Sequence, residues 1–131
     1  MANFISYGGI GVQAATFELD ATTKTEIGKN FDSAVGKAVA LTGNNTVGYG
    51  TSGGAVFGFV LKCDARGLAT VQYHGFREDV PISATAANQP ALGGGVCVDG
   101  KGGIVKPAAD AASGGKVTCV DTTAKTAVIL L

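Results

Sequence analysis

The chain has 131 residues, 21 of them glycine, and its 10 Lys or Arg residues balance 10 Asp or Glu residues. This length predicts one domain, and zero net charge argues against the basic surface that nucleic-acid binding requires. The glycines have no three-residue period, which excludes collagen, and no apolar run is long enough for a membrane span. The N-terminus lacks the features of a signal peptide, so we expect the protein to fold where it is made.

The first 35 residues differ in composition from the rest of the chain. Four large apolar side chains stand there among glycines: Phe4, Ile5, Tyr7 and Ile10. This pattern predicts an extended arm that lays a strand on another chain, with a first strand of the domain's own sheet as the alternative. We expect a strand over residues 12–19 and a polar loop over residues 20–30.

From residue 36 onward, short apolar runs alternate with Gly and Asp turns, which is typical of a compact all-β domain. We prefer a strand over residues 37–41 to a helix over 32–40, because turn residues follow at 43–45. Gly58 lies inside the next apolar run and indicates a bulge or a close backbone contact. Further strands are expected at residues 55–62, 68–74, 80–82, 96–99, 104–106, 116–121 and 126–131.

The chain also repeats itself weakly at an offset of 57 residues. The matched positions are turn glycines, a turn aspartate and apolar strand residues, where folding needs positive φ or a buried side chain. They include Gly36 and Gly93, Val39 and Val96, Leu41 and Val98, Gly58 and Gly115, Val60 and Val117, Asp64 and Asp121, and Val71 and Val128. The predicted fold is therefore all-β, a small Gly-rich β-barrel or sandwich with two pseudo-repeated halves. The arm and first strand would occupy residues 1–35 and the β-domain residues 36–131, with halves at about 36–92 and 93–131.

One segment matches a nucleotide-binding motif in part. Residues 95–101 spell G-x-x-x-x-G-K, but Gly102 stands where a P-loop needs Ser or Thr. The residues between the two glycines alternate like a strand, so we expect a hairpin turn here and no phosphate site.

Candidate metal ligands and nucleophiles are equally sparse. His74, Glu78 and Asp79 are close in sequence, but they are interpreted as a polar hairpin end, since His74 is the only histidine. The three cysteines are odd in number and lack C-x-x-C spacing, which favours buried reduced thiols: Cys63, Cys97 and Cys119. We therefore expect no enzymatic activity, no cofactor and no metal.

The order of motifs after residue 36 resembles a known family. The chain contains KAVALTG, NNTVG, AVFGFVLKCD, GLATVQYHG, DVPIS, LGGGVCVDGKGGIVKP, GGKVTCVD and the C-terminal TAVILL. This order is similar to that of the small head-decoration, or capsid cement, proteins of tailed bacteriophages. The resemblance covers residues 36–131, rests on glycines and aliphatic residues, and does not extend to the first 35 residues.

The resemblance implies a β-barrel or sandwich without catalytic activity, made in the host cytoplasm and attached to the outer surface of the assembled capsid. Its partners would be the major capsid protein and other copies of itself, with a trimer favoured, and neither nucleic acid nor membrane. Phe4, Ile5, Tyr7 and Ile10 would contact the capsid or a neighbouring protomer. The alternative is a small β binding module of a phage tail or bacterial surface structure that recognises protein or carbohydrate. The absence of tryptophan weakens the carbohydrate hypothesis.

Overall fold

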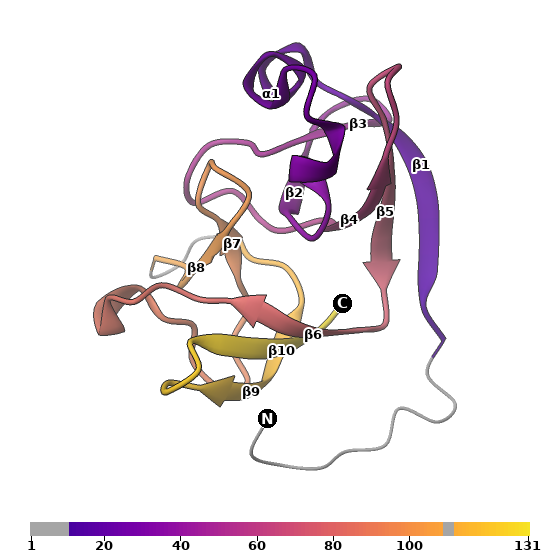
Figure 1. Cartoon of the computed structure of the whole chain (residues 1–131). Coiled ribbons are helices and arrows are strands. Elements are labelled where there is room, and N and C mark those ends of the chain that lie inside the picture. The colour runs from indigo at the N-terminus through magenta and orange to yellow at the C-terminus, as the bar shows by residue number, and fades with distance from the viewer. Residues whose placement is uncertain (1–10, 109–111) are drawn as a thin grey trace.

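The computed structural model describes residues 11–108 and 112–131, which form two β-rich lobes (Figure 1). The first lobe contains β1 (Gln13–Leu19), α1 (Ala21–Ile27), η1 (Phe31–Ala34), β2 (Ala38–Gly43), β3 (Thr46–Gly48), β4 (Gly58–Cys63) and β5 (Leu68–His74). The label η denotes a short 3₁₀ helix. The second contains β6 (Phe76–Pro81), η2 (Ala86–Asn88), β7 (Cys97–Val98), β8 (Ile104–Val105), β9 (Lys116–Asp121) and β10 (Thr126–Leu130). The expected all-β fold with little helix is confirmed.

The five strands of the first lobe form a closed barrel in the order β1-β3-β2-β4-β5. β1 closes it, because it runs antiparallel to β5, with Phe17 opposite Ala69, and parallel to β3, with Leu19 opposite Val47. Closure removes the free edges that an open sheet would expose. The strand expected over residues 12–19 is thus part of the barrel, and a boundary at residue 36 would cut through the first lobe.

The second lobe has the same kinds of strand pairs in a less complete arrangement. β6, β10 and β9 form one sheet, and β7 and β8 form a separate hairpin. A bridge between Val96 and Gly114 joins the hairpin to the chain just before β9. β10 pairs with β6 as β5 pairs with β1 in the first lobe. β6 and β8, which correspond to β1 and β3, are not paired within the described residues.

Backbone hydrogen bonds show that the repeat is structural. Three bonds of the first lobe recur in the second: Gly36 N to Val60 O (2.7 Å) and Gly93 N to Val117 O (2.8 Å), Val60 N to Lys37 O (3.0 Å) and Val117 N to Gly94 O (2.8 Å), and Phe57 N to Val39 O (2.8 Å) and Gly114 N to Val96 O (3.0 Å). Gly36 and Gly93 both have positive φ, 82° and 77°, a conformation that glycine adopts without strain. The hairpins β2–β3 and β4–β5 therefore correspond to β7–β8 and β9–β10.

The polar loop expected over residues 20–30 is wrong for most of its length, because residues 21–27 form α1. Asp20 caps this helix by accepting a hydrogen bond from Thr23 N at 2.8 Å, and Gly28 ends it with φ of 63°. Only Thr23 and Ile27, four residues apart, are buried. Two buried positions are too few to show a helical period in the sequence.

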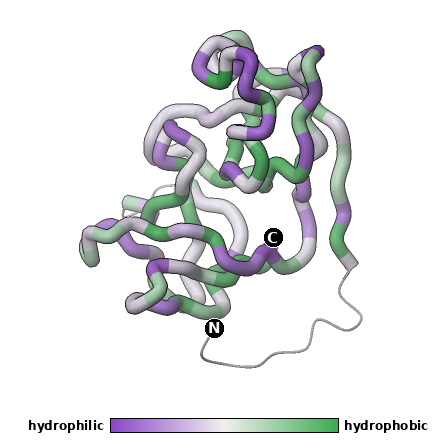
Figure 2. Tube along the Cα trace, in the orientation of Figure 1, coloured by the Kyte–Doolittle hydropathy of each residue, from purple (hydrophilic) through white to green (hydrophobic). Residues whose placement is uncertain are grey.

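Two apolar cores hold the molecule together. The inside of the barrel contains Leu19, Val39, Val47, Val60 and Val71. The second core crosses between the lobes: Ala38, Ala40 and Phe59, from β2 and β4, pack with Val80, Val96, Val98, Ile104, Val117 and Ile129. Figure 2 shows hydrophobic segments along the inner strands of both lobes, whereas the β4–β5 turn is hydrophilic. Because strands expose alternate faces, β2 and β4 contribute to both cores.

Candidate functional site

The four residues expected to contact a capsid or a neighbouring protomer, Phe4, Ile5, Tyr7 and Ile10, lie outside the described residues. The described chain begins at Gly11, beside the junction of β5 and β6. A Cβ atom added to Gly75 would lie 2.8 Å from the Gly11 carbonyl oxygen and 3.2 Å from Val12 Cα. Gly11 and Val12 therefore lie at the end of the barrel where β1 begins and β5 ends.

Three aromatic rings form a series in the first lobe, from Phe17, which lies opposite Ala69, to Tyr73 near this end of the barrel. The Phe17 and Phe57 ring centroids are 5.2 Å apart at an interplanar angle of 83°. The Phe57 and Tyr73 centroids are 6.3 Å apart at 21°. Tyr73 is 38% exposed, and Val12, at the start of β1, is 59% exposed. We call Val12, Phe17, Phe57 and Tyr73 the aromatic end.

Strand alternation explains how these side chains come together. Ala69 and Val71 of β5 are buried in the barrel. Tyr73, two residues further on, lies on the same face, one residue before the end of the strand. Phe17 and Phe57 pack against the barrel core. The rings are thus held by the barrel while part of the aromatic end stays in solvent. Rigid exposed aromatic groups are common in protein–protein interfaces.

The residues considered as metal ligands do not form a cluster. His74 ends β5, whereas Glu78 and Asp79 lie in β6, at the position where the β6–β10 register shifts. Within the described residues, no group of three or more His, Cys, Asp or Glu side chains could hold a metal ion.

The segment that partly matches a P-loop is a hairpin, as predicted. β7 is followed by a turn in which Asp99 Oδ1 accepts hydrogen bonds from Lys101 N at 2.7 Å and Gly103 N at 2.9 Å. The chain then returns as β8, which pairs with β7. A P-loop requires a helix at this point, whereas Lys101 lies in the loop between the paired strands β7 and β8.

The cysteines are free thiols, in agreement with the sequence prediction. Cys63 and Cys97 are buried, and burial raises the pKa of both thiols. A raised pKa leaves little of the reactive thiolate at neutral pH. Cys97 Sγ also lies 3.1 Å from the Ala112 carbonyl oxygen, to which it donates. Cys119 is half-buried.

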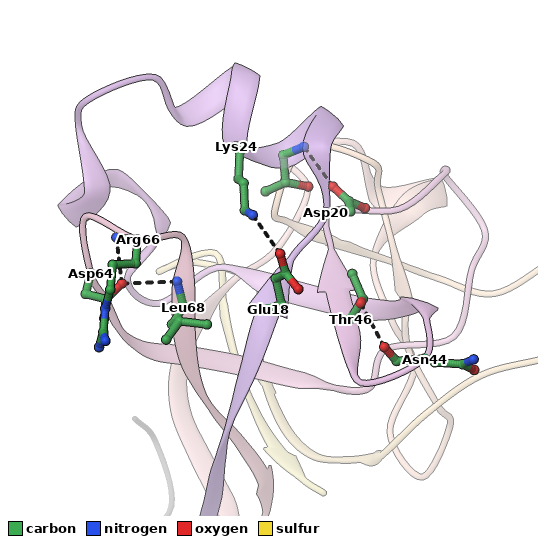
Figure 3. A network of polar contacts seen from close by, with 9 residues as sticks. Glu18, Asp20, Lys24, Asn44, Thr46, Asp64, Arg66 and Leu68 are labelled. Carbon is green, nitrogen blue, oxygen red and sulfur yellow. Dashed lines mark hydrogen bonds and ion pairs between the residues drawn. The ribbon is translucent and has the colours of Figure 1, made fainter.

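Polar contacts near α1 and the β4–β5 turn stabilise local structure (Figure 3). Lys24 pairs with Glu18 at 3.0 Å and Arg66 with Asp64 at 2.9 Å. Asp64 also accepts a hydrogen bond from Leu68 N at 3.1 Å. The Arg66 side chain is the main cause that lowers the pKa of Asp64. These contacts shape the turn and its surroundings. Lys24 and Arg66 also line a hollow of about 200 Å³, and Asp64, Arg66 and Leu68 line another of about 150 Å³.

The turn aspartate recurs in the second lobe, as the repeat predicted. Asp121 Oδ1 accepts hydrogen bonds from Thr123 N at 3.0 Å and Ala124 N at 2.9 Å, and the bond from Ala124 is the main cause that lowers its pKa. Asp64 Oδ1 makes the same kind of bond with Arg66 N at 2.9 Å. Both aspartates therefore act in hairpin formation.

The chain matches no family model, no curated protein and no solved structure in the three comparisons made. Within the described part of the chain, no helix has the length and apolar character needed to cross a membrane. The functional interpretation therefore depends on the aromatic end, the two-lobed frame and the motif order of residues 36–131.

Proposed function

We propose that the protein is a structural virion component that decorates a bacteriophage capsid and stabilises it by binding the major capsid protein on the outer head surface. The observation that carries this proposal is the aromatic end, where Tyr73 and Val12 are exposed. In the sequence, the apolar residues Phe4, Ile5, Tyr7 and Ile10 precede Val12. The resemblance of residues 36–131 to head-decoration proteins supports it. A homo-oligomer, with a trimer favoured, would present several such surfaces together.

Capsid stabilisation follows from linkage. A protein that binds the assembled shell and not the free subunits shifts the equilibrium toward the shell. Burial of one large apolar side chain contributes roughly 1.5–3 kcal/mol. Several anchors on each protomer, combined by oligomerisation, would give retention far stronger than one contact provides.

Deletion of residues 2–11 tests the proposal. The deletion leaves β1 intact, so we expect an unchanged thermal unfolding temperature and weaker co-sedimentation with undecorated phage heads. Tyr73→Ala should also weaken co-sedimentation. Leu92→Ala is the matched control, because Leu92 is 68% exposed but lies in the second lobe.

Three results would contradict this interpretation in different ways. If the deleted protein unfolds, the N-terminal segment is an integral strand of the domain. If the folded deletion variant and Tyr73→Ala both bind heads like the wild type, the capsid is held by another surface. If the wild-type protein does not sediment with heads at all, the capsid proposal fails.

A further inference from the structure

A polar recess lies between α1 and the β7–β8 turn, where the two lobes meet. It consists of two adjoining hollows of about 200 and 210 Å³ that share Glu26 and Tyr49 as lining residues. We call it the Tyr49 recess. Its other lining groups include the hydroxyls of Thr22, Thr42 and Thr51 and the ammonium groups of Lys37 and Lys101.

Tyr49 is the most informative residue of this recess. It is only 6% exposed, and its backbone amide donates to Thr23 Oγ1 at 3.1 Å. Its hydroxyl makes no hydrogen bond to another described residue, and no buried side-chain oxygen there lacks a partner. The hydroxyl oxygen is therefore accessible from the recess. Burial, followed by the negative charge of Glu26, raises the pKa of Tyr49. The hydroxyl is therefore protonated at neutral pH and can both donate and accept.

The groups around this hydroxyl have balanced charge. Glu26 offers carboxylate acceptors, and Lys37 and Lys101 offer donors; within the described chain none of the three forms an ion pair. Asp20 lies in the same recess, but its carboxylate already accepts from Thr23 N at 2.8 Å. An anion or a cation would satisfy one wall and leave the opposite charge without a partner. A neutral ligand with many hydroxyl groups can satisfy both walls.

We propose that the Tyr49 recess binds one neutral sugar residue of a glycan. Sugar hydroxyls both donate and accept, so one residue can bridge Glu26, Tyr49 and a lysine ammonium. Ile27 also lines the recess, and the small exposed parts of Ile27 and Tyr49, 8% and 6% of each residue, offer a limited apolar contact.

The position of the recess makes this binding compatible with capsid attachment. α1 follows the C-terminal end of β1, whereas the aromatic end begins at the N-terminal end of the same strand (Figure 1). A protein attached through its aromatic end would thus keep the Tyr49 recess open to solvent. The sugar site is independent of the proposed capsid contact.

NMR titration of the isolated full-length protein tests the site with three probes: the methyl glycosides of glucose, galactose and N-acetylglucosamine. We expect at least one glycoside to shift the amide signals of residues 20–26 and 49–51 in a saturable manner. Tyr49→Phe keeps the ring and removes only the hydroxyl, and it should weaken binding about five- to tenfold, the effect of one lost hydrogen bond. Tyr73→Phe is the matched control and should bind like the wild type.

A second variant tests the same site in case Tyr49→Phe does not fold. Glu26 is exposed, so Glu26→Gln should fold normally and also weaken glycoside binding. The proposal is overturned if no glycoside shifts the recess amides, or if Glu26→Gln and folded Tyr49→Phe bind as tightly as the wild type. It is also overturned if glycine zwitterion or inorganic phosphate saturates the recess while the glycosides do not. Head co-sedimentation is a separate measurement, so failure here leaves the capsid proposal standing.

Discussion

Gly58 shows how a single residue permits the barrel to close. A Cβ atom at this position would overlap the Gln72 carbonyl oxygen and lie 2.7 Å from Val71 Cγ1. The sequence prediction of a close backbone contact at Gly58 is therefore confirmed. No side chain other than hydrogen fits between β4 and β5 here without moving the backbone.

We expect Gly58→Ala to lower the free energy of unfolding by roughly 1–3 kcal/mol, as overpacking of a dense core does. Urea unfolding measured by circular dichroism would give this value. Gly11→Ala is the control, since a Cβ on Gly11 meets nothing within 4 Å. Equal stability of the two variants would show that β4 and β5 separate easily.

Asp20 links helix capping to acid stability. Its burial alone would raise its pKa, but hydrogen bonds from the Thr23 hydroxyl and amide and from Thr42 outweigh this and lower it. The folded state therefore binds the proton less readily than the unfolded state. The resulting stability is present above the ordinary pKa of 3.8 and is lost as the pH falls through the lower pKa of the folded protein.

We expect Asp20→Ala to cost about 1 kcal/mol of stability at neutral pH, the usual value of an N-cap. Asp20→Asn should cost less, because asparagine also caps helices, and it should remove the Asp20 part of the acid-induced loss. Urea unfolding of both variants at neutral pH and below pH 3.8 measures the two effects. An unchanged acid dependence in Asp20→Asn would contradict the lowered pKa.

Among the elements, β1 has the largest effect on the first lobe. It joins β3 to β5, and its last residue, Leu19, is 2% exposed in the barrel core. Without β1, the edges of β3 and β5 would be open. Residues 36–74 are therefore not sufficient for a closed first barrel.

We predict that Leu19→Ala lowers the free energy of unfolding by about 2–5 kcal/mol, because it creates a cavity in the core. Leu92→Ala makes the same chemical change at a residue that is 68% exposed, and it should be nearly neutral. Guanidinium unfolding curves of the two variants give the comparison. Similar midpoints would mean that β1 is not required for barrel stability.

The whole molecule is joined by Phe59, which is 1% exposed. It comes from β4 of the first lobe and packs in the core that contains Val96 and Ile129 of the second lobe. The Arg77 guanidinium carbon lies 5.9 Å from the centre of the Phe59 ring. The lobes should therefore unfold together although each has its own strand pairs.

Phe59→Ala should cost about 3–5 kcal/mol and destabilise both lobes. Amide hydrogen exchange followed by NMR can compare β4 and β5 with β9 and β10 in the wild type and the variant. Equal free energies of opening in the wild type, falling together in the variant, are expected. If only the second lobe loses protection, the lobes are separate folding units.

The candidate sites were harder to predict from the sequence than the fold, because their residues come together only in the tertiary structure. The aromatic end unites Phe17, Phe57 and Tyr73 from segments that barrel closure brings together, and nothing in their spacing predicted the contact. The Tyr49 recess was missed because its residues extend from Asp20 to Lys101 along the chain. Its one local signal was Asp20 followed by Thr23, which is the pattern of a helix cap.

The sequence by itself determined the local parts of this protein: the hairpins, the turn glycines Gly36 and Gly93, the turn aspartates Asp64 and Asp121, and the repetition of these features. Such features depend on positive φ, turn chemistry and strand alternation, which act over a few residues. Only the tertiary structure decided that β1 closes the barrel, that Phe59 joins the lobes and that α1 forms one side of the Tyr49 recess. These outcomes depend on contacts between distant segments, where packing and burial select one pairing among several that local propensity allows.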